Sequence, residues 1–180
     1  MRVAICLLML TVGCFLVPPS ALAEAPKADE GFTLFFNGKN LDGWVNHDGG
    51  AALDGQTMVK NNRFQVQDGL LVIDGKTKGN LVIDTTKKFS NKAHIKFEFL
   101  PDEKCNNDLY ILGLKFDLKT GSVKNLEAGK WHKFEIVANG DTVEFKCNGE
   151  VQATQKPKAE ASPLGVRAEF GAVQFRNRQY

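Results

Sequence analysis

The sequence predicts an all-β domain in which two antiparallel sheets pack face to face as a jelly-roll β-sandwich. From Phe32 onward, apolar residues alternate with polar ones at a period of two, which is typical of half-buried strands. Turn-forming pairs such as Asp68-Gly69 and Asn148-Gly149 recur at close spacing. No segment carries the sustained apolar stripe of a helix, and no repeat of fixed period indicates a propeller or solenoid. Together these observations favour a sandwich.

The first 23 residues are expected to be a signal peptide that takes no part in the fold. Arg2 provides the positive start, residues 3–17 are apolar, and Ala21-Leu22-Ala23 fits a cleavage site. The apolar run is too short for a comfortable membrane span. Lipidation at Cys14 is the alternative to ordinary cleavage. The prediction is an exported protein, periplasmic or secreted, with no transmembrane segment after cleavage.

The rest of the chain has the size of one domain. A short polar leader, residues 24–30, precedes a β-sandwich domain over residues 31–180. The formal net charge of the whole chain is +2 and its acids and bases are interspersed, so neither nucleic acid nor an anionic membrane is expected as a partner. No metal-ligand spacing or phosphate loop appears, and no cofactor is expected. The acidic pair Asp102-Glu103 leaves a divalent cation such as calcium open.

Cys105 and Cys147 are the cysteines that remain after the predicted cleavage. An oxidising compartment would permit a disulfide between them. Cys147 also shares the apolar face of its strand with Val143 and Phe145, which fits a buried free thiol equally well. Both states stay open at this level.

The expected strands follow one another in short runs. The first, residues 32–36, alternates and ends at Asn37-Gly38, a pair that accepts the positive φ of a tight turn. Leu41 and Trp44 then give the returning segment apolar side chains to bury. The remaining predicted strands are residues 64–67, 70–73, 81–84, 94–99, 112–118, 131–137, 142–147, 165–170 and 173–176.

Alternation assigns each predicted strand an apolar inner face and a polar outer face. A concave polar face with acids, bases and a histidine could bind an extended sugar, whereas a simply solvated face is the alternative. The outer faces hold His94, Lys96, Glu98, Lys115, Asp117, Arg167, Glu169, Gln174 and Arg176. The inner faces hold Ile95, Phe97, Phe99, Leu114, Phe116, Leu118, Val166, Ala168, Phe170, Val173 and Phe175.

Motifs at both ends of the domain carry a resemblance to a known family. The opening Gly31–Trp44 and the closing Pro163–Asn177 are the more specific, and Asp68-Gly69-Leu70 and Gly129-Lys130-Trp131 recur between them in the same order. With these motifs the chain resembles the 3-keto-disaccharide hydrolase family over residues 31–180. The resemblance implies a concanavalin A-like sandwich in exported bacterial proteins. It also implies cleavage of glycosidic bonds once position 3 of a glycosyl unit has been oxidised to a ketone.

The chemistry implied by this resemblance needs a base, an acid and a group that stabilises an enolate. A 3-ketone acidifies the neighbouring C2 proton, so a base can remove it, the C1 oxygen leaves and water adds back. For a carbohydrate substrate of this kind the expected catalytic residues are Glu98 or His94 as base, Arg176 or Arg167 as enolate stabiliser, and Asp117 or Glu169 as acid. Substrate contacts are expected from Lys96, Lys115, Arg167, Glu169 and Gln174.

The middle of the chain departs from the family pattern. Cys105-Asn106-Asn107-Asp108 stands where the family usually has an Asn-Ser-Gly turn, and residues 112–125 stand where a Glu-x-Gln-x-x-Asp segment is usual. Two functions therefore stay open. The chain is either a hydrolase or lyase of 3-keto-glycosides, or a carbohydrate-binding module that keeps the sandwich without catalysis.

Overall fold

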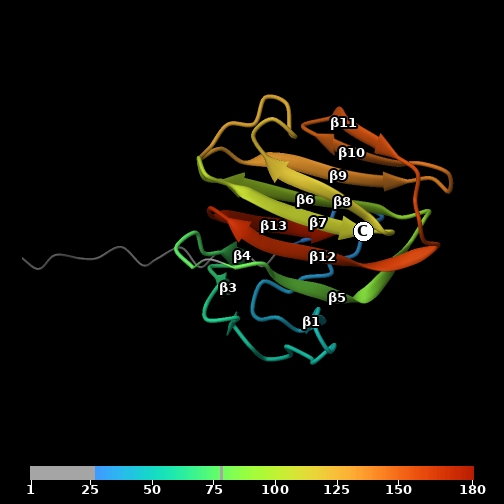
Figure 1. Ribbon diagram of the computed structural model, residues 1–180. Helices are drawn as coiled ribbons and strands as arrows, with labels where there is room; N and C mark the ends of the chain where they lie inside the picture. Colours follow the sequence, from blue (N-terminus) through green and yellow to red (C-terminus); the bar gives the residue numbers. More distant parts are fainter. Residues whose placement is uncertain (1–26, 78) are drawn as a thin grey trace, which may run out of the picture.

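The computed structural model describes residues 27–77 and 79–180, which form β-strands in two antiparallel sheets (Figure 1). The predicted signal peptide and Cys14 lie outside the described residues. Across the part that is described, all regular elements are strands, and no helix has the length and apolar character needed to cross a bilayer. The predicted all-β sandwich is therefore confirmed.

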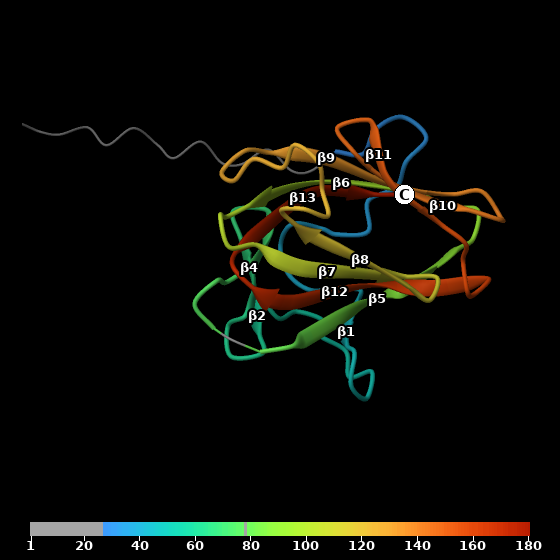
Figure 2. The same cartoon turned by 45° about the horizontal axis from the view of Figure 1, so that its top comes forward.

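The smaller sheet has five strands in the order β1-β5-β12-β7-β8. They are β1 (Trp44–Asn46), β5 (Leu81–Ser90), β12 (Ala161–Phe170), β7 (Asn106–Ile111) and β8 (Leu114–Lys119). The larger sheet has the order β11-β10-β9-β6-β13-β4-β3-β2. Its strands are β11 (Glu150–Gln155), β10 (Val143–Cys147), β9 (His132–Ala138), β6 (His94–Pro101), β13 (Val173–Gln179), β4 (Leu70–Ile73), β3 (Phe64–Gln67) and β2 (Met58–Val59). Figure 2 shows the two layers, with β5, β12, β7 and β8 below β9, β6 and β13.

The core lies between the two sheets and is rich in phenylalanine. Phe116 of β8 stacks on Phe145 of β10 with ring centroids 4.7 Å apart, and contacts Phe134 of β9 at 5.2 Å. Phe134 in turn stacks on Phe97 of β6 at 5.1 Å. Such aromatic pairs add about 0.5–1.5 kcal/mol each beyond the burial of their area. The inner faces predicted for 94–99 and 114–118 are those that hold this core.

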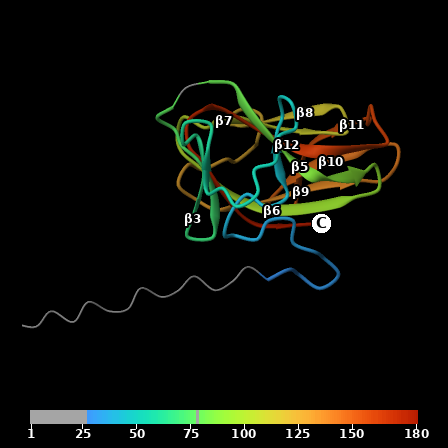
Figure 3. The ribbon, with the colours of Figure 1, turned by 90° about the horizontal axis from the view of Figure 1, so that it is seen from below.

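The predicted strand over residues 32–36 is wrong. Only Leu34 forms a β-bridge, with Gln179, although Thr33 N also donates to Tyr180 O at 2.9 Å. Figure 3 shows this segment, in blue, passing close to the C-terminus. The segment follows the end of β13 too briefly to form a strand. The turn after it is confirmed, because Asn37 Oδ1 accepts hydrogen bonds from the backbone N of Lys39 and Asn40.

Two β-bulges change which side chains face inward. In β13, Arg176 pairs with Glu98 while Gln179 pairs with Lys96, so one extra residue is accommodated near Asn177, which has φ 53°. Arg178 consequently points into the interior. A similar bulge lies between Arg167 and Phe170 of β12. Phe170, predicted to point inward, is therefore 52% exposed.

The sequence did not predict β7, because Asn106-Asn107-Asp108 has the composition of a turn. In the structure Asn107 is fully buried, and its side-chain amide donates to Phe170 O at 3.0 Å and accepts from Glu169 N at 2.9 Å. These bonds bridge the backbone across the bulge in β12. Leu112 and Gly113 both have positive φ and form the two-residue turn to β8, so β8 begins at Leu114 rather than at Leu112.

Cys105 and Cys147 are free, buried cysteines in this structure, so the disulfide considered above is not formed. Cys105 Sγ donates to Leu118 O at 3.3 Å. Burial raises the pKa of each thiol to about 11, which keeps both protonated at neutral pH.

Candidate functional site

The predicted site residues are divided between the two outer faces of the sandwich. Because the sheets pack through their apolar faces, their polar faces point in opposite directions. The larger sheet carries His94, Lys96, Glu98, Gln174 and Arg176. The smaller sheet carries Lys115, Asp117, Arg167 and Glu169. A single site that combines Glu98 or His94 with Asp117 or Glu169 is therefore excluded by the topology.

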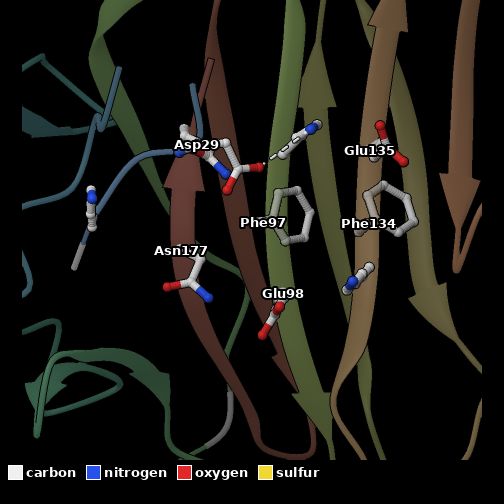
Figure 4. Close-up of a pocket in the computed structure, with 10 residues that line it drawn as sticks. Asp29, Phe97, Glu98, Phe134, Glu135 and Asn177 are labelled. Carbon is white, nitrogen blue, oxygen red and sulfur yellow. Dashed lines mark hydrogen bonds and ion pairs between the residues drawn. The ribbon is translucent and has the colours of Figure 1, made fainter. Parts of the chain in front are cut away.

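A hollow of about 350 Å³ lies on the outer face of the larger sheet (Figure 4). Its floor is formed by β6, β9 and β13, and one wall is the leader segment at Asp29. Asp29 N donates to Gln179 Oε1 at 2.6 Å, and the Asp29 carboxylate lies 3.4 Å from Lys96 Nζ. These two contacts hold the leader along the sheet.

The predicted catalytic groups on this face are tied to charged partners. Arg176 Nε donates to Glu98 at 2.5 Å, and its guanidinium lies 4.0 Å from the centre of the Trp131 ring. His94 Nε2 is 2.7 Å from Glu135 Oε2. Each pair links neighbouring strands. The hollow therefore presents polar groups that can hydrogen bond with hydroxyls, but Asp29 and Glu98 are paired with cations and Glu135 contacts His94.

The smaller sheet carries a more closely coupled group on β7, β8 and β12. We call Asp108, Lys115, Asp117, Arg167 and Glu169 the Asp108 cluster. The strand register places Asp108 directly opposite Asp117 on one side and Arg167 on the other. Asp108 has 0% exposure although it lies on the outer face, because its neighbours cover it. A buried carboxylate on a sheet's polar face is the unusual feature of this cluster.

Ion pairs surround the two aspartates of the cluster. Arg167 donates to Asp108 through Nε and Nη2, and Nη2 also contacts Glu169 Oε2 at 2.6 Å. Lys115 Nζ lies 2.5 Å from Asp117 Oδ1 and 3.5 Å from Asp108 Oδ1. Two cations thus face two neighbouring carboxylates and hold them close together despite their like charge.

The pKa values of the two aspartates are displaced in opposite directions. Burial, followed by the hydrogen bond with Asp117, raises the pKa of Asp108 to about 6. The hydrogen bond from Asp108, followed by the one from Lys115, lowers the pKa of Asp117 to about 2. Two carboxyl groups that share one proton titrate as a unit. Asp117 is partly open to solvent and Asp108 lies behind it, so the pair can exchange a proton through Asp117.

Sequence reasoning missed Asp108 and also the pair of His47 with Asp84. His47 Nδ1 lies 2.7 Å from Asp84 Oδ2 on the same outer face. Gly165 of β12 leaves room there, since a Cβ at this position would come within 2.6 Å of Asp84 Oδ1. Asp108 could have been found from the Leu112-Gly113 turn: a two-residue hairpin at this point pairs Asp108 with Asp117.

Within residues 27–77 and 79–180, no three His, Cys, Asp or Glu side chains come together as metal ligands. Asp102, whose pair with Glu103 leaves calcium open in the sequence, accepts hydrogen bonds from two backbone amides. Its carboxylate accepts hydrogen bonds from Lys104 N at 2.9 Å and Ala172 N at 2.8 Å. These bonds join the turn after β6 to the turn before β13.

The comparisons with known proteins point to carbohydrate-acting relatives. Residues 31–124 match the model of the 3-keto-alpha-glucoside-1,2-lyase-like domain. A structure from Parabacteroides distasonis, named as a candidate glycosyl hydrolase, superposes with a TM-score of 0.64 at 20% identity, covering 83% of this chain and 93% of that one. A second from the same organism, named likewise, gives 0.61 at 13% identity, covering 82% and 97%. No curated protein matches the chain in sequence.

Porphyranase B from Zobellia galactanivorans shares the same architecture. It superposes with a TM-score of 0.51 at 10% identity, and the match covers 87% of this chain and 97% of the porphyranase. At identities this low, the three structures establish the fold alone. They confirm the predicted concanavalin A-like sandwich over most of the described chain.

Proposed function

The chain belongs to the 3-keto-alpha-glucoside-1,2-lyase-like family, whose model matches more than half of it, and from this premise we propose that it is an exported enzyme that cleaves 3-keto-glycosides at the Asp108 cluster. The observation that carries the proposal is the Asp108–Asp117 pair. Two neighbouring carboxyl groups with widely separated pKa values are typical of sites that transfer protons. Cations beside them supply the other requirement of enolate chemistry.

The proposed base is the aspartate pair acting through its exposed member. The pair begins without a proton; Asp117 takes the proton from C2 of the 3-keto sugar, and the pair then holds it as the one proton shared with Asp108. The C2–H electron pair forms the C2–C3 double bond of an enolate, and the negative charge moves to the C3 oxygen. Arg167 and Lys115 lie on the same face and can donate hydrogen bonds to that oxygen.

The enolate then expels the C1 oxygen. Its electron pair re-forms the C3 ketone, a C1–C2 double bond forms, and the C1–O bond breaks. The proton taken from C2 passes from Asp117 to the leaving oxygen, so Asp117 acts first as base and then as acid. Glu169, which is partly exposed and contacts Arg167, would accept a hydrogen bond from a hydroxyl of the sugar. A water molecule that adds across C1 and C2 completes hydrolysis. In this scheme Asp117, Glu169 and Arg167 are the catalytic residues, and Asp108 is a positioning residue.

A second candidate function uses the hollow on the larger sheet. Its volume of about 350 Å³ falls in the range of small-ligand sites, and its walls are polar. A non-catalytic carbohydrate-binding module would bind its sugar there, with Glu98, Lys96 and Lys133 as contacts. This candidate needs no proton transfer and leaves the Asp108 cluster as a structural network.

The test incubates the protein with a 3-keto-disaccharide such as 3-keto-trehalose and measures the release of 3-keto-glucose by mass spectrometry. Asp117→Asn is expected to lower kcat by about 100-fold or more, the usual contribution of a positioned base. Glu144→Gln, which removes an outer-face acid of the larger sheet, is the matched control and should change kcat less than twofold.

Two outcomes would contradict the proposal. The first is oligosaccharide binding without any product release, which favours the binding module. The second is loss of activity in Glu98→Gln with full activity in Asp117→Asn, which moves the chemistry to the opposite face. Circular dichroism and thermal unfolding establish that each variant is folded.

A further inference from the structure

A second hollow, of about 420 Å³, lies between the end of β5, the start of β6 and the chain terminus. We call it the basic hollow and define it by Lys87, Lys88, Lys92, Phe32 and Tyr180. Phe89, Ser90 and His94 also line it. It contains three lysines and no carboxylate side chain among its lining residues. This composition differs from the mixed charges of the hollow shown in Figure 4.

The lysines of the basic hollow have no acidic side chain as a partner among the residues that the structure describes. Within the described chain, Lys87, Lys88 and Lys92 take part in no ion pair, in contrast to Lys96 and Lys115. The acid at the start of β12, Glu160, is engaged by Asn91, whose Nδ2 donates to Glu160 Oε2 at 2.8 Å. Three ammonium groups around one hollow repel one another, and a bound anion would remove that repulsion.

Aromatic rings hold part of this positive charge in place. Lys87 Nζ lies 3.9 Å from the centre of the Tyr180 ring, and on the far side of the leader Lys96 Nζ lies 4.2 Å from the centre of the Phe32 ring. A lysine over an aromatic face loses some of its rotamer freedom before a ligand arrives. The half-buried rings of Phe32 and Tyr180 give the hollow apolar surface beside its charges. The site therefore suits a ligand with both an anionic group and an apolar ring face.

We propose that the basic hollow binds an anionic sugar, one whose ring carries a sulfate or phosphate ester. The ester would contact Lys88 and Lys92, and the sugar ring would pack against the Tyr180 and Phe32 side. The proposal is independent of cleavage at the Asp108 cluster. A membrane surface fits less well, because the exposed large apolar residues, Met58, Val151 and Phe170, do not line this hollow.

The test compares dextran sulfate with neutral dextran by isothermal titration calorimetry on the secreted chain. Binding to dextran sulfate alone is expected, and it should weaken as NaCl is raised. The Lys88→Gln/Lys92→Gln double variant should bind about five- to tenfold more weakly, because it removes the two exposed charges that would contact the ester.

The matched control is the Lys60→Gln/Lys104→Gln double variant, which removes the same charge at the other end of the sheet. Lys104 follows the end of β6, and Lys60 precedes the start of β3. These two strand ends lie at the same edge of the sheet, because Phe64 of β3 pairs with Ile73, Ile73 with Val173, and Val173 with Pro101 of β6. This control should bind dextran sulfate within twofold of the wild type. Equal losses in both double variants would show a non-specific charge effect and overturn the proposal.

Inorganic sulfate and lipid vesicles distinguish the source of the anion. If inorganic sulfate displaces dextran sulfate at an equal concentration of sulfate groups, the site binds free anions and the sugar has no role. If phosphatidylglycerol vesicles bind more tightly than dextran sulfate, with the same loss in Lys88→Gln/Lys92→Gln, the surface is a membrane contact. Either result overturns the proposal.

Discussion

Replacing Arg178 by methionine is expected to stabilise the protein. Arg178 is 3% exposed, and its Nε, Nη1 and Nη2 atoms have no hydrogen-bond acceptor among the residues that the structure describes. Its guanidinium lies 3.6 Å from the centre of the Phe36 ring and 5.7 Å from that of Trp44. Burial lowers the pKa of Arg178 well below its ordinary value, which shows how strongly this environment disfavours the charge.

The magnitude follows from two opposing contributions. Removing an ion from water costs several kcal/mol even after relaxation. The ring contact returns about 2 kcal/mol when it is desolvated. Methionine keeps most of the volume and can contact the same rings through sulfur. The net expectation is a gain of about 1–3 kcal/mol in the free energy of unfolding, which corresponds to a rise of roughly 3–10 °C in Tm for a domain of this size.

The assay is urea unfolding at pH 7, monitored by tryptophan fluorescence, together with a thermal scan. Arg63→Met is the matched comparison, because Arg63 is also fully buried with no hydrogen-bond acceptor for its guanidinium among the described residues. Burial lowers the pKa of Arg63, but the charges of Asp74 and Asp102 oppose this lowering, so removal of Arg63 leaves negative charge uncompensated. Its gain should be smaller or negative. A loss of more than 1 kcal/mol in Arg178→Met would refute the reasoning, since it would mean that the guanidinium is well satisfied.

Two further predictions concern ionisation and the cysteines. The pKa of Asp108 in the folded state is about 6, above its ordinary value of 3.8. Between these two pH values the folded state therefore binds more protons than the unfolded state. The contribution of Asp108 to the free energy of unfolding consequently falls as pH rises through this range. Relative to Asp108→Asn, the wild type should lose up to about 3 kcal/mol between pH 4 and pH 7 in urea unfolding, and a relative gain over this range would contradict the burial argument. Protein secreted after loss of the first 23 residues should show two thiols with Ellman's reagent when denatured without reductant, and a count of zero would indicate a disulfide between Cys105 and Cys147.

Alternation along the strands predicted most faces correctly but could not assign strands to sheets. The inner and outer residues of β6 and β8 are those expected, because a period of two depends only on local backbone geometry. Whether two polar faces are the same or opposite depends on which strands pair, and this is decided by contacts distant in sequence. Glu98 and Asp117 were therefore expected in one site and lie on opposite sides of the sandwich.

The features that escaped prediction are polar residues used as interior structure. Asn107 and Asp108 belong to types that usually occupy turns, yet here they satisfy the backbone beside a bulge and anchor Arg167. The burial of Arg178 could not be predicted, because the bulge at Asn177 shifts by one residue the alternation of inner and outer side chains along β13. In each case a specific long-range partner outweighs the local preference of the residue.

The bulge at Asn177 makes the end of β13 sensitive to slippage by one residue. In a regular strand Asn177 would face the interior and Arg178 would face water, with Gln179 turned inward and separated from Asp29. A β-branched residue at position 177 disfavours the left-handed conformation by about 1–2 kcal/mol, which is comparable to the net penalty estimated for burying Arg178. In such a variant the two alignments would therefore be closer in free energy than in the wild type. The φ angle of Asn177 therefore determines whether Arg178 lies in the core or in solvent. It also determines whether Gln179 can keep its hydrogen bond with Asp29 of the leader.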